Sequence, residues 1–90
     1  MPVRTGELEI VNDLGLHARA ASKLVALANK FNAEVWVGSN GREVNAKSIL
    51  GVLMLAAAKG STVTLRCEGA QSEQAFTELR KLVEDGFGEL

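Results

Sequence analysis

The sequence predicts an α+β fold: a four-stranded antiparallel sheet covered on one face by three helices, in the order βαββαβα. Four segments alternate polar and apolar residues, the period of a strand with one buried face. Three other segments carry apolar residues every three or four positions, the period of an amphipathic helix. A sheet with one apolar face needs helices to cover it, which gives an open-faced sandwich.

Length and composition predict one domain over residues 1–90 and exclude several classes of function. Ten basic and eleven acidic residues give a net charge of −1, whereas nucleic-acid binding needs a basic domain. No apolar run resembles a signal sequence or spans a bilayer, so we expect a cytoplasmic protein without membrane insertion. One histidine and one cysteine suggest neither a disulfide nor a zinc site, and we expect no metal and no cofactor.

The first strand and first helix enclose the only histidine of the chain. Glu7–Val11 alternates as a half-buried strand. The helix that follows has an apolar face at Ala21, Leu24, Leu27, Ala28 and Phe31. His17 therefore lies at or just before the first helical turn.

A histidine in this position has the surroundings that phosphate chemistry needs. The first amides of a helix lack intrahelical partners and carry partial positive charge, which suits an anion. That charge favours a neutral imidazole, the form that attacks phosphorus. Gly15 allows close backbone approach, and Arg19 supplies a guanidinium fork for phosphate oxygens. From residue type and position alone, however, a surface histidine without chemistry is the commoner case.

The next segments predict a hairpin. Glu34–Val37 alternates as a strand, with Val35 and Val37 on one face. The pair Asn40-Gly41 is a strong hairpin signal, because both residues tolerate positive φ. Glu43–Ala46 then returns as the third strand.

The second predicted helix runs from Ile49 to about Ala57, with Ser48 as its N-cap. Apolar side chains occupy two opposite sides of this helix. Val52, Leu55 and Ala56 form one side, and Leu50, Leu53 and Met54 form the other. Both sides cannot face one core, so we expect one of them to be presented to partner proteins.

The last strand and helix complete the predicted fold. Thr62–Glu68 alternates and places Cys67 inside as a small core residue. The final helix follows Ser72, with its buried stripe at Phe76, Leu79, Leu82 and Val83. Gly86 ends it, and residues 87–90 are expected to form a short tail.

Two motifs in this chain resemble those of a known family. Gly15–Arg19 (GLHAR) is similar to the active-site signature of HPr, the histidine-containing phosphocarrier of the bacterial sugar phosphotransferase system. Val44–Leu53 (VNAKSILGVL) resembles the regulatory-serine segment of that family. The likeness extends over nearly all 90 residues and implies the HPr-like open-faced sandwich. The family usually has proline where this chain has Ala20, and alanine is also a good helix former.

The resemblance implies a phosphocarrier, which takes part in phosphoryl transfer but does not turn over substrate alone. His17 would accept a phosphoryl group on Nδ1 from phosphorylated enzyme I and pass it to enzyme IIA domains. Arg19 would stabilise the charge, and the amides of Ala18 and Arg19 would donate hydrogen bonds to the phosphoryl oxygens. The protein is expected to act as a monomer, without a cofactor.

The predicted docking surface around His17 combines apolar and basic side chains from the first two helices. Its members are Ala20, Lys23, Lys47, Ile49, Leu50, Leu53 and Met54. Ser48 is a cap on pattern alone; the resemblance adds a regulatory role, with an HPr kinase/phosphorylase as a further partner. The alternatives are a nitrogen-related phosphotransfer paralogue, a mainly regulatory binding protein controlled through Ser48, and an unrelated module that binds an anion.

Overall fold

The computed structural model describes residues 2–90 and has the predicted order of strands and helices. The elements are β1 (Val3–Glu9), α1 (Ala18–Ala28), β2 (Glu34–Ser39), β3 (Arg42–Asn45), α2 (Ile49–Met54), β4 (Thr62–Glu68) and α3 (Ser72–Glu84), followed by the 3-10 turn η1 (Gly86–Gly88). The fold class predicted from the alternating and helical periods is confirmed.

The four strands form one antiparallel sheet in the order β1-β4-β2-β3. The first strand thus lies beside the last, and the connections through α1 and α2 each cross over a neighbouring strand. The register pairs Leu8 with Val63 on β1 and β4, and Val37 with Leu65 on β2 and β4. Cross-strand partners point to the same side of a sheet, so these four side chains share the face that the helices cover.

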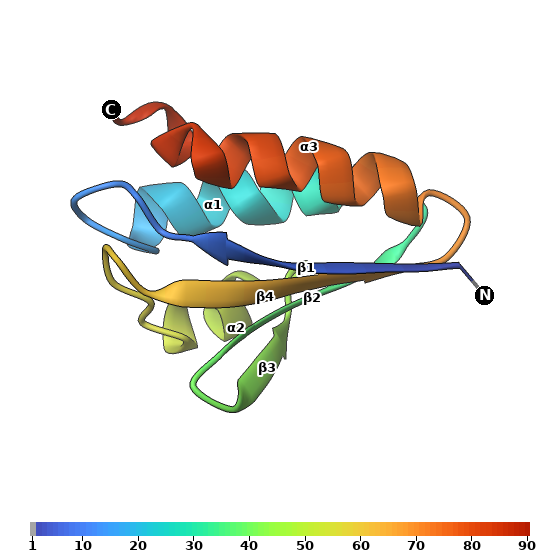
Figure 1. The fold of residues 1–90 in the computed structure, drawn as a ribbon, viewed down its shortest axis with the longest axis horizontal. Coiled ribbons are helices and arrows are strands. Elements are labelled where there is room, and N and C mark those ends of the chain that lie inside the picture. The colour runs from blue at the N-terminus through green and yellow to red at the C-terminus, as the bar shows by residue number, and fades with distance from the viewer. Residues whose placement is uncertain (1) are drawn as a thin grey trace.

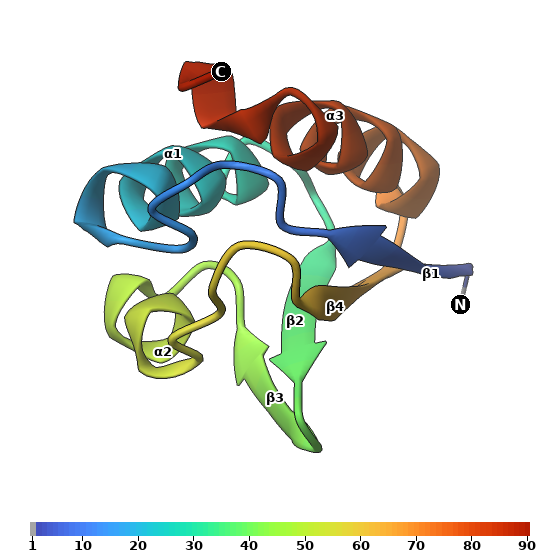
Figure 2. The same ribbon diagram turned by 60° about the vertical axis from the view of Figure 1, so that its left-hand side comes forward.

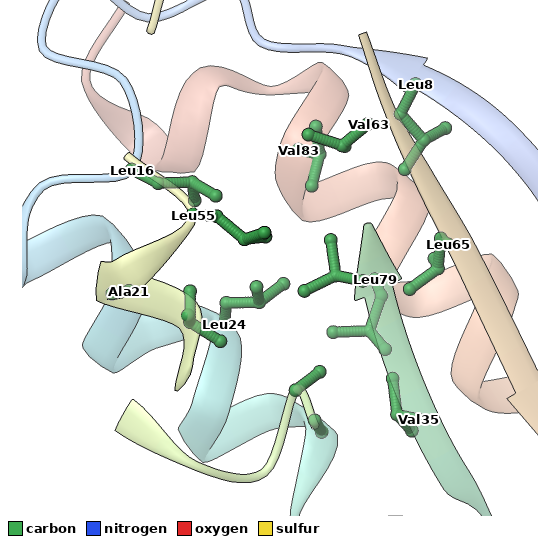
Figure 3. Close-up of a cluster of buried hydrophobic side chains, with 14 of the residues drawn as sticks. Leu8, Leu16, Ala21, Leu24, Val35, Leu55, Val63, Leu65, Leu79 and Val83 are labelled. Atoms are coloured by element: carbon green, nitrogen blue, oxygen red, sulfur yellow. The ribbon is translucent and has the colours of Figure 1, made fainter. Parts of the chain in front are cut away.

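The helices lie on one side of the twisted sheet (Figures 1 and 2). Helix α3 packs over β1 and β4, α1 lies beside α3, and α2 packs beside α1 near β3. The core fills the space between the two layers, with contributions from every helix and from β1, β2 and β4 (Figure 3). Cys67 is fully buried there, as predicted, and burial raises the pKa of its thiol to about 11.

Three predicted boundaries were wrong by a few residues. The first strand spans Val3–Glu9 instead of Glu7–Val11, because β4 offers pairing partners along this whole length, from Glu68 opposite Val3 to Thr62 opposite Glu9. Helix α1 ends at Ala28 and not at Phe31. Helix α2 ends at Met54 instead of Ala57, because the chain turns into a left-handed conformation at Ala56 (φ 49°).

The predicted hairpin is confirmed in its backbone angles. Asn40 and Gly41 have φ values of 53° and 79°, so both central residues adopt the left-handed conformation of a type I′ turn.

No helix within residues 2–90 is both long enough and apolar enough to cross a membrane.

Candidate functional site

His17 is the N-cap residue of α1, where sequence spacing placed it. Its backbone is extended (φ −75°, ψ 179°), and its carbonyl accepts a hydrogen bond from the Ala21 amide at 2.8 Å. Its side chain does not cap the helix and is 24% exposed. The imidazole is therefore held at the positive end of the helix while part of the ring stays open to solvent.

The loop before His17 is fixed by the segment that precedes β4. The Leu16 amide donates to the Ala57 carbonyl at 2.9 Å. Gly15 has φ 63°, and a Cβ atom there would lie 2.4 Å from that same carbonyl oxygen. Any other residue at position 15 would push the two segments apart, so glycine is required to bring His17 to its place.

A carboxylate from the C-terminal tail reaches the histidine ring. Oε2 of Glu89 lies 2.5 Å from Nε2 of His17, and Oε1 of Glu89 accepts from Nδ2 of Asn12 at 2.9 Å. The hydrogen bonds from Asn12 and His17, with a smaller contribution from the charge of Arg19, lower the pKa of Glu89 below its usual 4.5. These contacts therefore stabilise the folded chain above about pH 4.5 and are lost as the pH falls through the lowered pKa.

The residues expected to stabilise a phosphoryl group are on the surface beside the ring. Ala18 and Arg19 are exposed at the start of α1, where backbone amides have no intrahelical acceptor. Arg19 and Lys23 line an open hollow together with Glu89 and the loop before the helix. Arg19 and the free amides at the helix start are groups that can bind an anion.

Two residues predicted for docking have other roles. Ala20 is completely buried against the core, so its side chain cannot contact a partner. Its neighbour Ala21 is also fully buried, because both residues lie on the side of α1 that faces the core. Lys23 is exposed, but its ammonium donates to the Phe87 carbonyl at 2.6 Å and thereby ties the tail to α1.

Helix α2 presents an apolar surface, which we call the docking face and define as Ile49, Leu50, Leu53 and Met54. Leu50 and Met54 are 70% and 64% exposed, Ile49 is 37% exposed, and Leu53 is half-buried. Val52 and Leu55 point into the core, as predicted, whereas Ala56 is exposed.

Lys47 and Ser48 lie far from His17. The Lys47 ammonium donates to the Phe31 carbonyl just beyond the C-terminal end of α1, whereas Ala57 contacts the loop at the N-terminal end of that helix. Helices α1 and α2 are therefore antiparallel, and Ser48 lies about one length of α1, roughly 16 Å, from the histidine. The expectation that Lys47 edges a patch around His17 was wrong.

Ser48 caps α2 as predicted. Its side chain is exposed and accepts a hydrogen bond from the Gly51 amide at 3.3 Å. The hydroxyl is thus accessible at the start of the helix that carries the docking face.

Sequence reasoning missed Glu89, which contacts the imidazole, and Asn12, which donates a hydrogen bond to Glu89. The sequence held one hint of the position of Glu89. Two residues before it, the aromatic Phe87 stands between two glycines, in a segment that was expected to be a free tail. In the structure Phe87 is fully buried, and Gly86, Phe87 and Gly88 all have positive φ, which turns the chain back over α1. Asn12 carried no signal of its own; it is completely buried in the loop, and its amide also donates to the Gly15 carbonyl at 2.9 Å.

The fold and this site define a class of protein: a small open-faced sandwich that presents one imidazole at a helix start. Within residues 2–90 no three His, Cys, Asp or Glu side chains come together to hold a metal ion. In the part of the chain that the structure describes, Nε2 of His17 contacts Glu89, whereas no hydrogen bond engages Nδ1.

Comparison with known proteins identifies the family. The family model for the PTS HPr component phosphorylation site matches residues 4–85. The phosphocarrier protein HPr of Cupriavidus necator is 52% identical over 80 residues, which cover 89% of this chain and 90% of that protein. The crystal structure of HPr from Thermoanaerobacter tengcongensis superposes with a TM-score of 0.93 at 41% identity, covering 97% of this chain and 98% of the other.

A relative with a different name also matches. The phosphocarrier protein NPr of Shewanella violacea is 41% identical over 83 residues, covering 92% of this chain and 91% of that protein. On the family model and the high identity to its members, the chain belongs to the HPr family of phosphocarrier proteins of the phosphotransferase system.

Proposed function

We propose that this protein accepts a phosphoryl group on Nδ1 of His17 from phosphorylated enzyme I and passes it to enzyme IIA domains of sugar permeases. The observation that carries the proposal is the arrangement of His17 at the start of α1, where Glu89 holds Nε2 and no hydrogen bond engages Nδ1. Glu89 also lines a hollow with Arg19. The family relationship supports the partners and a cytoplasmic location.

Transfer between two imidazoles exchanges one N–P bond for another. The protein therefore contributes by positioning the reacting groups and by stabilising the charge on the phosphoryl oxygens. His17 is the nucleophile. Arg19 and the amides of Ala18 and Arg19 are placed to hydrogen-bond the phosphoryl oxygens as charge develops on them. The docking face of α2 would bind the apolar surface of enzyme I or of a IIA domain, and the exposed Arg19 would meet an acidic rim.

The direct test is labelling with enzyme I and ³²P-phosphoenolpyruvate. The wild-type protein should acquire acid-labile, base-stable phosphate, as expected for a phosphoramidate, and His17→Ala should acquire none while remaining folded. Arg19→Ala should be labelled more slowly with little loss of stability, because the residue is exposed. Label that persists on His17→Ala would refute the assignment of the phosphorylated residue.

A second candidate is a nitrogen-related branch of phosphotransfer, favoured by the identity to NPr. The same site would serve both branches, so the discriminating property is the choice of partner. Phosphorylation rates measured in parallel with a sugar-branch and a nitrogen-branch enzyme I, at equal concentrations, separate the two. A clear preference for the nitrogen-branch enzyme would favour the second candidate.

We also propose that phosphorylation of Ser48 regulates the carrier. The exposed hydroxyl lies next to Ile49 and Leu50 of the docking face, and a phosphate would bring about −2 charge to that surface. Because Ser48 lies at the opposite end of α1 from His17, its effect would fall on the bound partner and not on the histidine itself.

A further inference from the structure

We propose that Glu89 is a positioning residue for phosphoryl transfer: it holds the His17 ring with a proton on Nε2, so that the lone pair of Nδ1 faces the incoming phosphoryl group. The proposal rests on the function proposed above and assigns a role to a residue outside the stretch 4–85 that the family model matches.

The hydrogen-bond donors around Glu89 fix the tautomer of His17. The amide nitrogen of Asn12 can only donate, and it occupies Oε1 of Glu89 at 2.9 Å. An ionised carboxylate can only accept, so the 2.5 Å contact between Oε2 and Nε2 requires the hydrogen to come from the ring. A neutral imidazole has one N–H and one lone pair, which leaves the lone pair on Nδ1.

Glu89 can serve this purpose because the tail that carries it is rigidly docked. Phe87 is fully buried, and its carbonyl accepts from the Lys23 ammonium at 2.6 Å. The Glu89 amide donates to the Gly86 carbonyl at 2.9 Å. Asn12, completely buried, braces the carboxylate from the side of the loop. The side chain of Glu89 is only 15% exposed as a result.

The same contact balances the charge of the transfer step. The Nδ1 lone pair forms the new N–P bond while the bond between phosphorus and the donor's imidazole nitrogen breaks, and the donor leaves with that electron pair as neutral imidazole. The proton on Nε2 stays in place throughout. The His17 ring becomes cationic, and the carboxylate of Glu89 at 2.5 Å from Nε2 offsets that charge.

The substitution Glu89→Gln tests this reasoning with nearly unchanged shape. A glutamine offers one oxygen and one NH₂ group, and the buried Asn12 amide requires the oxygen. The NH₂ group then faces Nε2, which must accept, and the ring proton moves to Nδ1 where it blocks the nucleophile. Glu84→Gln is the matched control, because it makes the same change of charge at an exposed position in the last turn of α3.

The tautomer is measured by ¹⁵N NMR on protein labelled in the histidine ring, where His17 gives the only signals. We expect Nε2 protonated in the wild type and in Glu84→Gln, and a shift toward protonated Nδ1 in Glu89→Gln. With enzyme I as donor, the maximal rate of phosphorylation should fall at least tenfold in Glu89→Gln, with the half-saturating enzyme I concentration unchanged.

The tautomer and rate measurements distinguish failure of the positioning role of Glu89 from failure of the proposed phosphocarrier function. An unchanged tautomer or an unchanged maximal rate in Glu89→Gln would overturn the positioning role. If the wild type were not labelled at all, the proposed function would fail, and the ring-orienting role would be decided by the tautomer measurement alone. A rate loss of the same size in Glu84→Gln would show a general charge effect and would also overturn the proposal.

Discussion

Replacing Phe87 with alanine tests whether the C-terminal tail belongs to the core. The ring is completely buried, although the residue lies only three positions before Leu90, in a segment that sequence patterns treat as free. Truncating a buried phenylalanine removes its transfer free energy and leaves a cavity, which together cost about 3–5 kcal/mol. For a domain of this size that corresponds to a melting temperature lower by about 12 °C or more.

The assay is urea denaturation at pH 7, followed by far-UV circular dichroism, with Leu90→Ala as the control. Leu90 is in the same tail but is 78% exposed, so its truncation should change the free energy of unfolding by less than about 1 kcal/mol. Phe87→Ala should also loosen the contact between Glu89 and His17, visible as a partial shift of the histidine tautomer. A loss below about 1 kcal/mol, or equal losses in the two variants, would refute the docked tail.

Three further predictions concern the surface and the core. Leu50→Glu should weaken binding to enzyme I and to a IIA domain by about tenfold or more in calorimetry. It should change the free energy of unfolding by less than about 1 kcal/mol, because Leu50 is 70% exposed. A large loss of stability with unchanged binding would mean that the docking face is misassigned. Phospho-Ser48 should slow enzyme I-dependent labelling of His17 by about tenfold or more, equivalent to ~1.4 kcal/mol, and labelling at the unmodified rate would leave Ser48 as a helix cap alone. Burial raises the thiol pKa of Cys67 to about 11, so the thiol should resist iodoacetamide at pH 8 in the folded protein and react readily in urea. Equal rates of modification in the folded and urea-unfolded protein would contradict its burial.

Most of the secondary structure followed from local spacing, because each pattern reports hydrogen bonding within a few residues. The alternation in Thr62–Glu68 predicted β4 and its buried Cys67, and the pair Asn40-Gly41 predicted its turn. The strand and helix spacing on either side of His17 placed this residue at the start of α1, and the position of Ser48 before an apolar helix predicted a cap. For His17, the sequence therefore predicted both the residue and its position at the N-terminal end of a helix.

The tertiary structure alone decided what surrounds that histidine. The order of the strands, the antiparallel course of α1 and α2, and hence the distance from Ser48 to His17 depend on which surfaces fit together. Glu89 is 72 positions from His17 in the chain. It reaches the ring because the buried Phe87 and the hydrogen bond from Lys23 to the Phe87 carbonyl dock the tail against α1. Periodicity carries no information about such a contact, since packing between remote segments is set by the shape of the whole core.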